Sequence, residues 1–376
     1  MPSWLRAALA LFVVGFGANQ FAAMLPVYRV EDGATDAQVT ALFGAYAVGL
    51  IPALLVMGPL SDRLGRQRVI RPVLVLTFVA TVVLMVGGHS LTLLLVGRLL
   101  AGIASGAAFA PGTAWVRELS TDDPSAGARR AAIALTAGFG SGPLVTGVIA
   151  QWAPSPTVLP YVAHLVLTVA IAVIAWSTPE PIRTTTSEPE ARGVRTALTS
   201  TTFLREVVPT APWVFGCATL AFATLPAIVD VPGPEIAMVG ALVAITLGTG
   251  IVLQPYGRRL DRRATLASGL AAGVAGFGVG AIAAATDLAI LVVVACMLLG
   301  AAYGFVLVAG LRAVEEVTPP RDLATVNAVF YSLTYLGFAG PYLGTLLLGA
   351  VTGVTAMLLI GVLMASCAAV ALTRRR

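Results

Sequence analysis

Long apolar stretches alternate with short polar segments along the whole chain, and twelve of the stretches reach the length of a membrane span. A spanning helix needs roughly 20 apolar residues, about twice the length of a barrel strand. In lipid a segment must satisfy its own backbone hydrogen bonds, so we expect every stretch to be a helix. The predicted helices cover residues 4–27, 37–59, 69–88, 91–115, 128–150, 157–177, 207–228, 235–256, 264–285, 288–311, 322–349 and 353–373.

The composition supports a membrane protein and excludes several other classes. Of the 376 residues, 58% are hydrophobic and 11% are charged, whereas soluble domains have roughly 45–50% and about 25%. With a mean hydropathy of +0.91, the chain is neither a soluble enzyme nor a disordered protein. The sequence contains no nucleophile constellation, phosphate loop or metal-ligand cluster, so no catalysis, cofactor or metal is expected. The net charge of +5 comes without a basic stripe, so no nucleic acid is expected as a partner.

The arginines indicate the orientation of the helices. All but two of the 23 basic residues fall on one side of the predicted helices, and the exceptions are Arg29 and Arg98. Because cytoplasmic loops carry an excess of basic residues, we expect an integral, multi-pass protein of the cell membrane with both termini in the cytoplasm.

One long polar segment separates two groups of six helices. It is rich in Pro, Thr, Glu and Arg, which is typical of a flexible linker, and an amphipathic helix within 191–205 is the alternative. We expect an N-terminal six-helix bundle at 1–178, a cytoplasmic linker at 179–206 and a C-terminal six-helix bundle at 207–376.

The two groups share landmarks at nearly one offset. The pairs, 199 or 198 residues apart, are Gly58 with Gly257, Asp62 with Asp261, and Gly142-Pro143 with Gly340-Pro341. A shared offset indicates that the second six helices repeat the first with the same topology. Parallel repeats of this kind form transporters. The predicted fold class is an all-α polytopic membrane protein with 12 transmembrane helices in two parallel six-helix repeats.

Three motifs resemble those of the major facilitator superfamily. The loop 58–68 is similar to its G-x-L-a-D-r-x-G-r-r/k signature, and 98–102 resembles its R-x-x-q-G motif, with Ala101 where Gln is usual. The third resembles the G-x-x-x-G-P-x-x-G-G motif of its drug-exporting antiporters and comprises Gly138, Gly142, Pro143 and Gly147. The resemblance implies the 12-helix fold of the drug:proton antiporter branch.

The resemblance also implies a conformational latch in the loop after the second helix. A carboxylate there can face a helix N-terminus or pair with Arg66 or Arg117. The alternative is that the arginines only set the topology, although topology does not require Asp62 or Gly65. The expected latch residues are Gly58, Asp62, Arg63, Gly65, Arg66, Arg117 and Asp261.

Small residues in the fifth helix permit a neighbouring helix to approach closely, and Pro143 can kink the helix. The resemblance favours a pivot and a proton-tight seal between the halves, and ordinary helix packing is the alternative. The expected seal residues are Gly138, Gly142, Pro143, Gly147, Gly340 and Pro341.

Arg98 is the basic residue predicted inside a helix, where a charge is costly. We expect it to be paired by substrate, polar side chains or water, with snorkelling as the alternative. Tyr331 and Tyr335 share one helix face and suit amphipathic molecules with aromatic character; interfacial anchoring or core packing is their alternative role. The expected substrate-binding residues are Asn19, Gln20, Tyr46, Arg98, Asn327, Tyr331 and Tyr335.

The sequence predicts a secondary active transporter that exports drugs or other small amphipathic compounds by alternating access. No acidic residue is predicted deep inside a helix, so the candidate proton carriers are Asp36, His164 and Asp230. Exchange for protons is left open, and uptake of a specific small anion or nutrient is the alternative function. The expected partners are the substrate, membrane lipids and, with coupling, protons; a monomer is sufficient.

Overall fold

The computed structural model describes residues 1–121, 124–181, 191–319 and 322–373. Within them, twelve helical segments are long and apolar enough to cross a membrane, which confirms the predicted number. The chain divides into two compact units. The first comprises Met1–Thr185 with Ile236–Ala241, and the second comprises Thr186–Glu235 with Leu242–Arg376.

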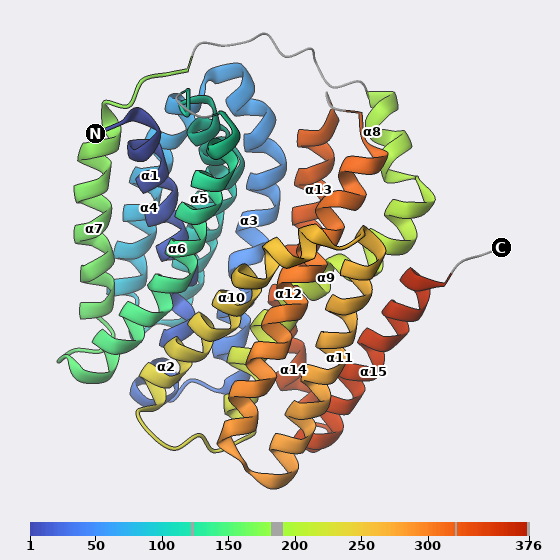
Figure 1. Ribbon diagram of the computed structural model, residues 1–376. Coiled ribbons are helices and arrows are strands. Elements are labelled where there is room, and N and C mark those ends of the chain that lie inside the picture. The colour runs from blue at the N-terminus through green and yellow to red at the C-terminus, as the bar shows by residue number, and fades with distance from the viewer. Residues whose placement is uncertain (122–123, 182–190, 320–321, 374–376) are drawn as a thin grey trace. The chain divides into compact units, whose positions relative to one another are not determined.

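The first unit contains the first six spans (Figure 1). The predicted first helix is two helices joined by a short 3-10 turn, Phe21–Met24. The helices are α1 (Ser3–Gln20), α2 (Leu25–Asp32), α3 (Asp36–Leu64), α4 (Arg66–Val86), α5 (Leu91–Glu118), α6 (Pro124–Trp152) and α7 (Leu159–Trp176).

The remaining helices belong to the second unit, except that the start of α10 is assigned to the first. They are α8 (Ala191–Leu198), α9 (Val208–Ala223), α10 (Glu235–Arg259), α11 (Arg262–Thr286), α12 (Ala289–Val317), α13 (Leu323–Tyr335), α14 (Gly340–Leu348) and α15 (Gly353–Leu372). A π-helical turn, Phe203–Val207, precedes α9, and 3-10 turns at Leu225–Ala227 and Leu336–Ala339 follow α9 and α13.

Glycines on α5 bring it into direct backbone contact with α3. A Cβ atom on Gly102 would overlap the carbonyl oxygen of Tyr46, and one on Gly106 would overlap that of Leu50. Lipid gives helices no hydrophobic reason to associate, so close backbone packing through small residues is a main source of helix affinity.

The second unit repeats this contact 198 residues later. A Cβ on Gly300 of α12 would overlap the carbonyl oxygen of Thr246 on α10, and one on Gly304 would overlap that of Gly250. The internal repeat therefore includes the glycines at which helix backbones meet.

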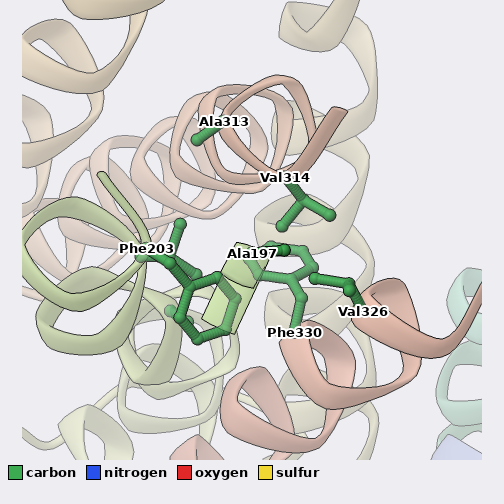
Figure 2. Close-up of a cluster of buried hydrophobic side chains, with 8 residues drawn as sticks. Ala197, Phe203, Ala313, Val314, Val326 and Phe330 are labelled. Carbon is green, nitrogen blue, oxygen red and sulfur yellow. The ribbon is translucent and has the colours of Figure 1, made fainter. Parts of the chain in front are cut away.

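The segment after the first unit includes a helix, α8, at residues for which a flexible linker was the favoured prediction. Val194, Ala197 and Leu198 follow helical spacing, and they pack on the second unit. Figure 2 shows the cluster of buried hydrophobic side chains to which Ala197 belongs, which we call the α8 cluster. It consists of Ala197, Phe203, Val207, Ala211, Ala313, Val314, Val326 and Phe330. Residues 191–198 are thus helical, as the alternative prediction states, because the apolar face of α8 packs against buried hydrophobic side chains.

We expect Gly102→Ala to lower the thermal unfolding midpoint of the detergent-solubilised protein by a few degrees. The added methyl must displace the Tyr46 carbonyl, and overpacking costs roughly 1–3 kcal/mol. Gly278→Ala on α11 is the matched control, because a Cβ there has no neighbour within 4 Å. Equal midpoints for the two variants would contradict the role of the α3–α5 contact.

Candidate functional site

Arg98 lies on α5 and is completely buried inside the first unit. Its guanidinium donates hydrogen bonds to three backbone carbonyls: Nε to Leu42 (3.2 Å), Nη2 to Phe43 (3.1 Å) and Nη1 to Ala18 (3.5 Å). Among the described residues, no acidic side chain pairs with it. The carbonyls of α1 and α3 therefore supply the acceptors that the cation requires.

Aromatic rings surround the same guanidinium. The ring centroids of Phe21, Tyr46 and Phe43 lie 4.5, 4.7 and 5.7 Å from its carbon atom. Ring faces attract a cation, so rings and carbonyl dipoles together stabilise the charge. The expected pairing with substrate, polar side chains or water stays a prediction, with snorkelling as its alternative.

A second polar cluster in the first unit centres on His164 of α7, which is also completely buried. Its Nδ1 lies 3.1 Å from Gln20 Nε2 and 2.9 Å from Thr81 Oγ1, and its Nε2 lies 3.1 Å from the Val13 carbonyl oxygen. The imidazole stacks on the ring of Phe16 at a centroid distance of 5.4 Å. The predicted proton carrier His164 and the predicted substrate ligand Gln20 thus lie side by side.

A small cavity adjoins this cluster. Its volume of about 10 Å³ holds about one water molecule. The lining residues come from α1, α4, α5 and α7, and they are Val14, Gly17, Ala18, Gln20, Thr77, Ala80, Thr81, Leu84, Ala101, Ala104, Ser105 and His164. Gly17 is required here, because a Cβ atom would overlap the imidazole. Asn19 is buried at the end of α1 but does not line the cavity.

Two buried tyrosines that sequence reasoning did not single out meet in the same unit. Tyr28 of α2 and Tyr161 of α7 are completely buried, and their hydroxyl oxygens are 2.6 Å apart. The hydrogen bond satisfies both phenols and ties α2 to α7. No local pattern marks this pair, because the residues are 133 positions apart.

The predicted substrate residues of the second unit have different surroundings. Tyr335 is buried and stacks on Phe215 of α9 at a centroid distance of 4.6 Å, and Phe215 also lies 5.8 Å from Tyr303. Tyr331 is half-buried beside Phe330. Asn327 is half-buried, and its Oδ1 has no hydrogen-bond partner among the described residues. Tyr335 therefore belongs to an aromatic cluster, whereas Asn327 keeps an available acceptor.

Two acidic residues meet Arg66 at the first turn of α4. Arg66 pairs with Asp62 of α3 at 2.5 Å and with Glu118 of α5 at 2.8 Å. Arg117, the alternative partner predicted for Asp62, is exposed, as is Arg63. The adjacent Glu118 is the residue that completes the ion pairs, and sequence reasoning missed it.

Gly65 connects α3 to α4 in a conformation that favours glycine. Its φ is +110°, and a Cβ atom would lie 2.9 Å from the carboxyl carbon of Glu180. That carboxylate accepts hydrogen bonds from the backbone N–H groups of Arg66 (2.7 Å) and Gln67 (2.8 Å). A negative charge at the first turn stabilises a helix, so Glu180 caps α4. Gly58 differs, because a Cβ there would be 3.8 Å from its nearest neighbour.

In the corresponding loop of the second unit, Asp261 occupies a different position relative to its helix from Asp62, with which the sequence matched it. Asp261 caps its own helix, α11, by accepting from the N–H groups of Arg263 (2.8 Å) and Ala264 (3.2 Å). It directly precedes α11, as Gly65 precedes α4, so Asp261 corresponds to Gly65 and the offset here is 196. Asp62, which precedes Asp261 by 199 residues, lies instead within the last turn of α3.

The ion pair itself recurs. Arg262 pairs with Glu316 of α12 at 2.8 Å and also with Glu206. Arg66 and Glu118 thus have counterparts in Arg262 and Glu316, 196 and 198 residues later. The repeat offset could have identified these glutamates, because they lie at or next to the last residues of the corresponding helices α5 and α12.

The motif glycines of α6 contact α1. A Cβ on Gly138 would overlap the Phe12 carbonyl oxygen, and one on Gly142 would overlap that of Phe16. A Cβ on Gly147 would lie 3.5 Å from the Cβ of Ala23. These contacts are helix packing inside the first unit, and Pro143 lies within α6. The predicted seal between the halves stays a prediction.

In the second unit the tightest equivalent is Gly337, which sequence reasoning missed. A Cβ on Gly337 would overlap the backbone of Pro212 and Gly216 on α9. Gly340 makes ordinary contact with Leu220 at 3.4 Å, and Pro341 stands in the first turn of α14. Gly337 follows Gly138 by 199 residues, so the repeat offset could have identified it.

The two acidic candidates for proton transfer lie at loops. Asp36 is exposed and pairs with Arg29 at 2.6 Å. Asp230 is exposed, and its backbone N–H donates to Asp287 Oδ1 at 3.0 Å. Of the three candidates, His164 is the buried one. In the part of the chain that the structure describes, no three His, Cys, Asp or Glu side chains gather as metal ligands would.

Twelve candidate spans among the described residues, an internal repeat and a buried arginine are typical of polytopic membrane transporters. The family profile of the Major Facilitator Superfamily matches residues 7–270, and the chain belongs to this superfamily. Its members are transporters and not enzymes.

Two groups of known proteins resemble the chain. Multidrug resistance protein MdtL of Klebsiella pneumoniae is 28% identical over 199 residues, which are 52% of this chain and 43% of the relative. MdtL of Escherichia coli is 31% identical over 106 residues, 28% of this chain and 27% of the relative. The chain thus matches less than half the length of these curated relatives. Two structures of the nucleoside transporter NupG share the fold. The structure of a NupG variant has a TM-score of 0.75 and a sequence identity of 12%, and the match covers 97% of this chain and 98% of NupG. The second NupG structure has a TM-score of 0.70 and a sequence identity of 13%, and the match covers 100% of both chains.

We expect Gly65→Ala to lower both thermal stability and transport, whereas Gly58→Ala leaves both near wild type. The first change places a side chain at positive φ, which costs roughly 1–3 kcal/mol, and pushes Glu180 from the helix start. The second adds a methyl where space exists. Unfolding midpoints and transport rates of the two variants provide the test, and equal losses would show that the loop geometry is unimportant.

Proposed function

We propose that the protein is a secondary active transporter that exports drugs or other small amphipathic compounds across the cell membrane by alternating access. The observation that carries this proposal is the exporter-type motif of α6, whose Gly138 and Gly142 lie against the backbone of α1. The names of the MdtL relatives support the same substrate class.

The proposed substrate contacts differ between the two units. In the first, Asn19 and Gln20 offer amides, and Tyr46 lies over the Arg98 cation. In the second, Asn327, Tyr331 and Tyr335 offer one amide and two phenol rings. Aromatic and apolar surfaces bind flat amphipathic molecules without strict shape requirements, which suits a transporter of several compounds.

The proposed latch consists of one ion-pair cluster in each unit. Arg66 links α3, α4 and α5 through Asp62 and Glu118, and Arg262 links α11 to α12 through Glu316. Because these pairs hold helix ends together, a change between inward-open and outward-open forms is expected to rearrange them. We place this end of the helices and both termini in the cytoplasm, in keeping with the arginine distribution.

Cells that express the protein should accumulate less ethidium than cells that express Gly142→Leu at the same membrane level. Leucine at 142 cannot fit against the Phe16 carbonyl, so the variant is the transport-defective control. Unchanged accumulation across a broad panel of dyes and drugs would refute export. Inward flux of one labelled anion or nutrient without efflux would establish the alternative function, uptake of a specific solute.

Arg98→Lys should reduce turnover, and Arg98→Ala should reduce it further, by about tenfold or more. Lysine keeps the charge but loses the planar fork that reaches three carbonyls. Membrane level, substrate affinity and turnover are measured together in proteoliposomes. A defect confined to membrane level would assign Arg98 to assembly, and wild-type transport by Arg98→Ala would remove it from the proposed site.

A further inference from the structure

Two buried oxygen atoms beside the cavity have no hydrogen-bond partner among the described residues. They are Gln20 Oε1 and Thr77 Oγ1, on side chains that are 1% and 5% exposed. Both residues line the cavity, which holds about one water molecule. Buried polar atoms without partners are costly. A water molecule in this cavity would therefore find two free hydrogen-bond acceptors, Gln20 Oε1 and Thr77 Oγ1.

The neighbours of the two ring nitrogens of His164 match one neutral tautomer. Nε2 faces the Val13 carbonyl oxygen, which can only accept, so Nε2 carries a hydrogen. Nδ1 faces the Gln20 amide nitrogen, which can only donate. With this amide orientation Nδ1 is the acceptor, which is the pattern of a neutral imidazole with its hydrogen on Nε2.

The second neighbour of His164 Nδ1 is the Thr81 hydroxyl, which also contacts the Thr77 carbonyl oxygen. The hydroxyl of Thr81 has one hydrogen, and its oxygen lies 2.9 Å both from His164 Nδ1 and from the Thr77 carbonyl oxygen. When Thr81 donates to Thr77, as a helical threonine commonly does, its lone pairs face Nδ1. Gln20 then provides the donor on which the neutral state depends.

We propose that His164 is a proton-binding site that is switched by rotation of the Gln20 amide. As the Gln20 amide rotates its N–H group away from Nδ1, a hydronium ion in the cavity transfers its proton to the freed Nδ1 lone pair, forming an N–H bond and leaving water. Gln20 Oε1 then accepts from Nδ1–H, and the oxygen that lacked a partner gains one. The cationic ring then has acceptors at both nitrogens, Val13 and Gln20, with Thr81 Oγ1 as a third.

The other groups around the cavity leave protonation of His164 dependent on Gln20. Of the residues that line the cavity from α1, α4, α5 and α7, His164 alone is titratable. Between residues 91 and 116 of α5 the charged group is Arg98, one turn before Ala101, while Arg117 and Glu118 stand at the far end of that helix. The helix α6 has no charged group between residues 131 and 152. The hydroxyl of Tyr161 on α7 is hydrogen-bonded to that of Tyr28 on α2. No carboxylate among these groups favours the cation, so amide and hydroxyl oxygens must do so.

This inference deepens the proposed transport function, on which its biological role rests, by naming the group that couples transport to protons. A protein that binds the proton in one conformation and releases it in another would drive substrate in the opposite direction. The imidazole of His164 is packed between Gly17 and the ring of Phe16. The ring therefore keeps its place, and only the Gln20 amide has to rotate when Nδ1 gains or loses a proton.

The test is ¹⁵N-histidine NMR of the full chain in lipid bilayers between pH 8 and 5. The chain has two histidines, and His89→Gln removes the exposed one, leaving the His164 signal alone. The expected result is conversion of His164 to the doubly protonated ring as pH falls. Gln20→Met should require at least about tenfold more protons for the same conversion, because a hydrogen bond to the charged form is lost.

Thr168→Val is the matched control, since its hydroxyl bonds the His164 backbone carbonyl and not the ring. It should leave the titration unchanged. A wild-type His164 that stays neutral down to pH 5 overturns the proposal, as do equal shifts in Gln20→Met and Thr168→Val. The wild-type titration alone is decisive if Gln20→Met does not fold. Loss of dye efflux with a normal titration would instead reject export and leave the proton site standing.

Discussion

Glycine lets the helices of each unit approach until a carbonyl of one lies against the Cα of the other. This contact occurs between α5 and α3 at Gly102 and between α6 and α1 at Gly138. Lipid surrounds such helices with material as apolar as their own side chains, so close packing must supply what the hydrophobic effect supplies in water. The polar groups of the first unit depend on that packing, because Arg98 reaches the carbonyls of α1 and α3 only when the three backbones lie close together.

The repeat conserves packing and changes chemistry. Gly102 and Gly300 occupy the same place in their units, 198 residues apart, and both meet a neighbouring carbonyl. At the same offset, Arg98 corresponds to Cys296, whose thiol contacts the Ala221 carbonyl. The first unit thus carries a cation and a histidine cluster on a frame that in the second supports the aromatic cluster of Phe215. A duplicated scaffold has acquired two different interiors.

The twelve helices were predictable because each apolar run is long enough to span, and the repeat was visible in glycines and charges. The partners of Arg98 were not, because they are backbone carbonyls, which every residue has. Glu180 was missed for a related reason: it meets the start of α4 over a separation of 114 residues. The helix α8 was the less favoured of the two predictions for its residues, because the α8 cluster against which it packs is assembled from distant segments.

The caps of α4 and α11 differ in where they come from. α11 receives its cap from Asp261, the residue just before it, whereas α4 receives Glu180 from the segment that follows α7. A fragment of the first unit that stopped at residue 178, the predicted end of the bundle, would lose the carboxylate that closes its own third span. A fragment of the second unit would keep its cap intact. The natural border of the first bundle therefore lies beyond Glu180, within the segment that a division by apolar runs assigns to the linker.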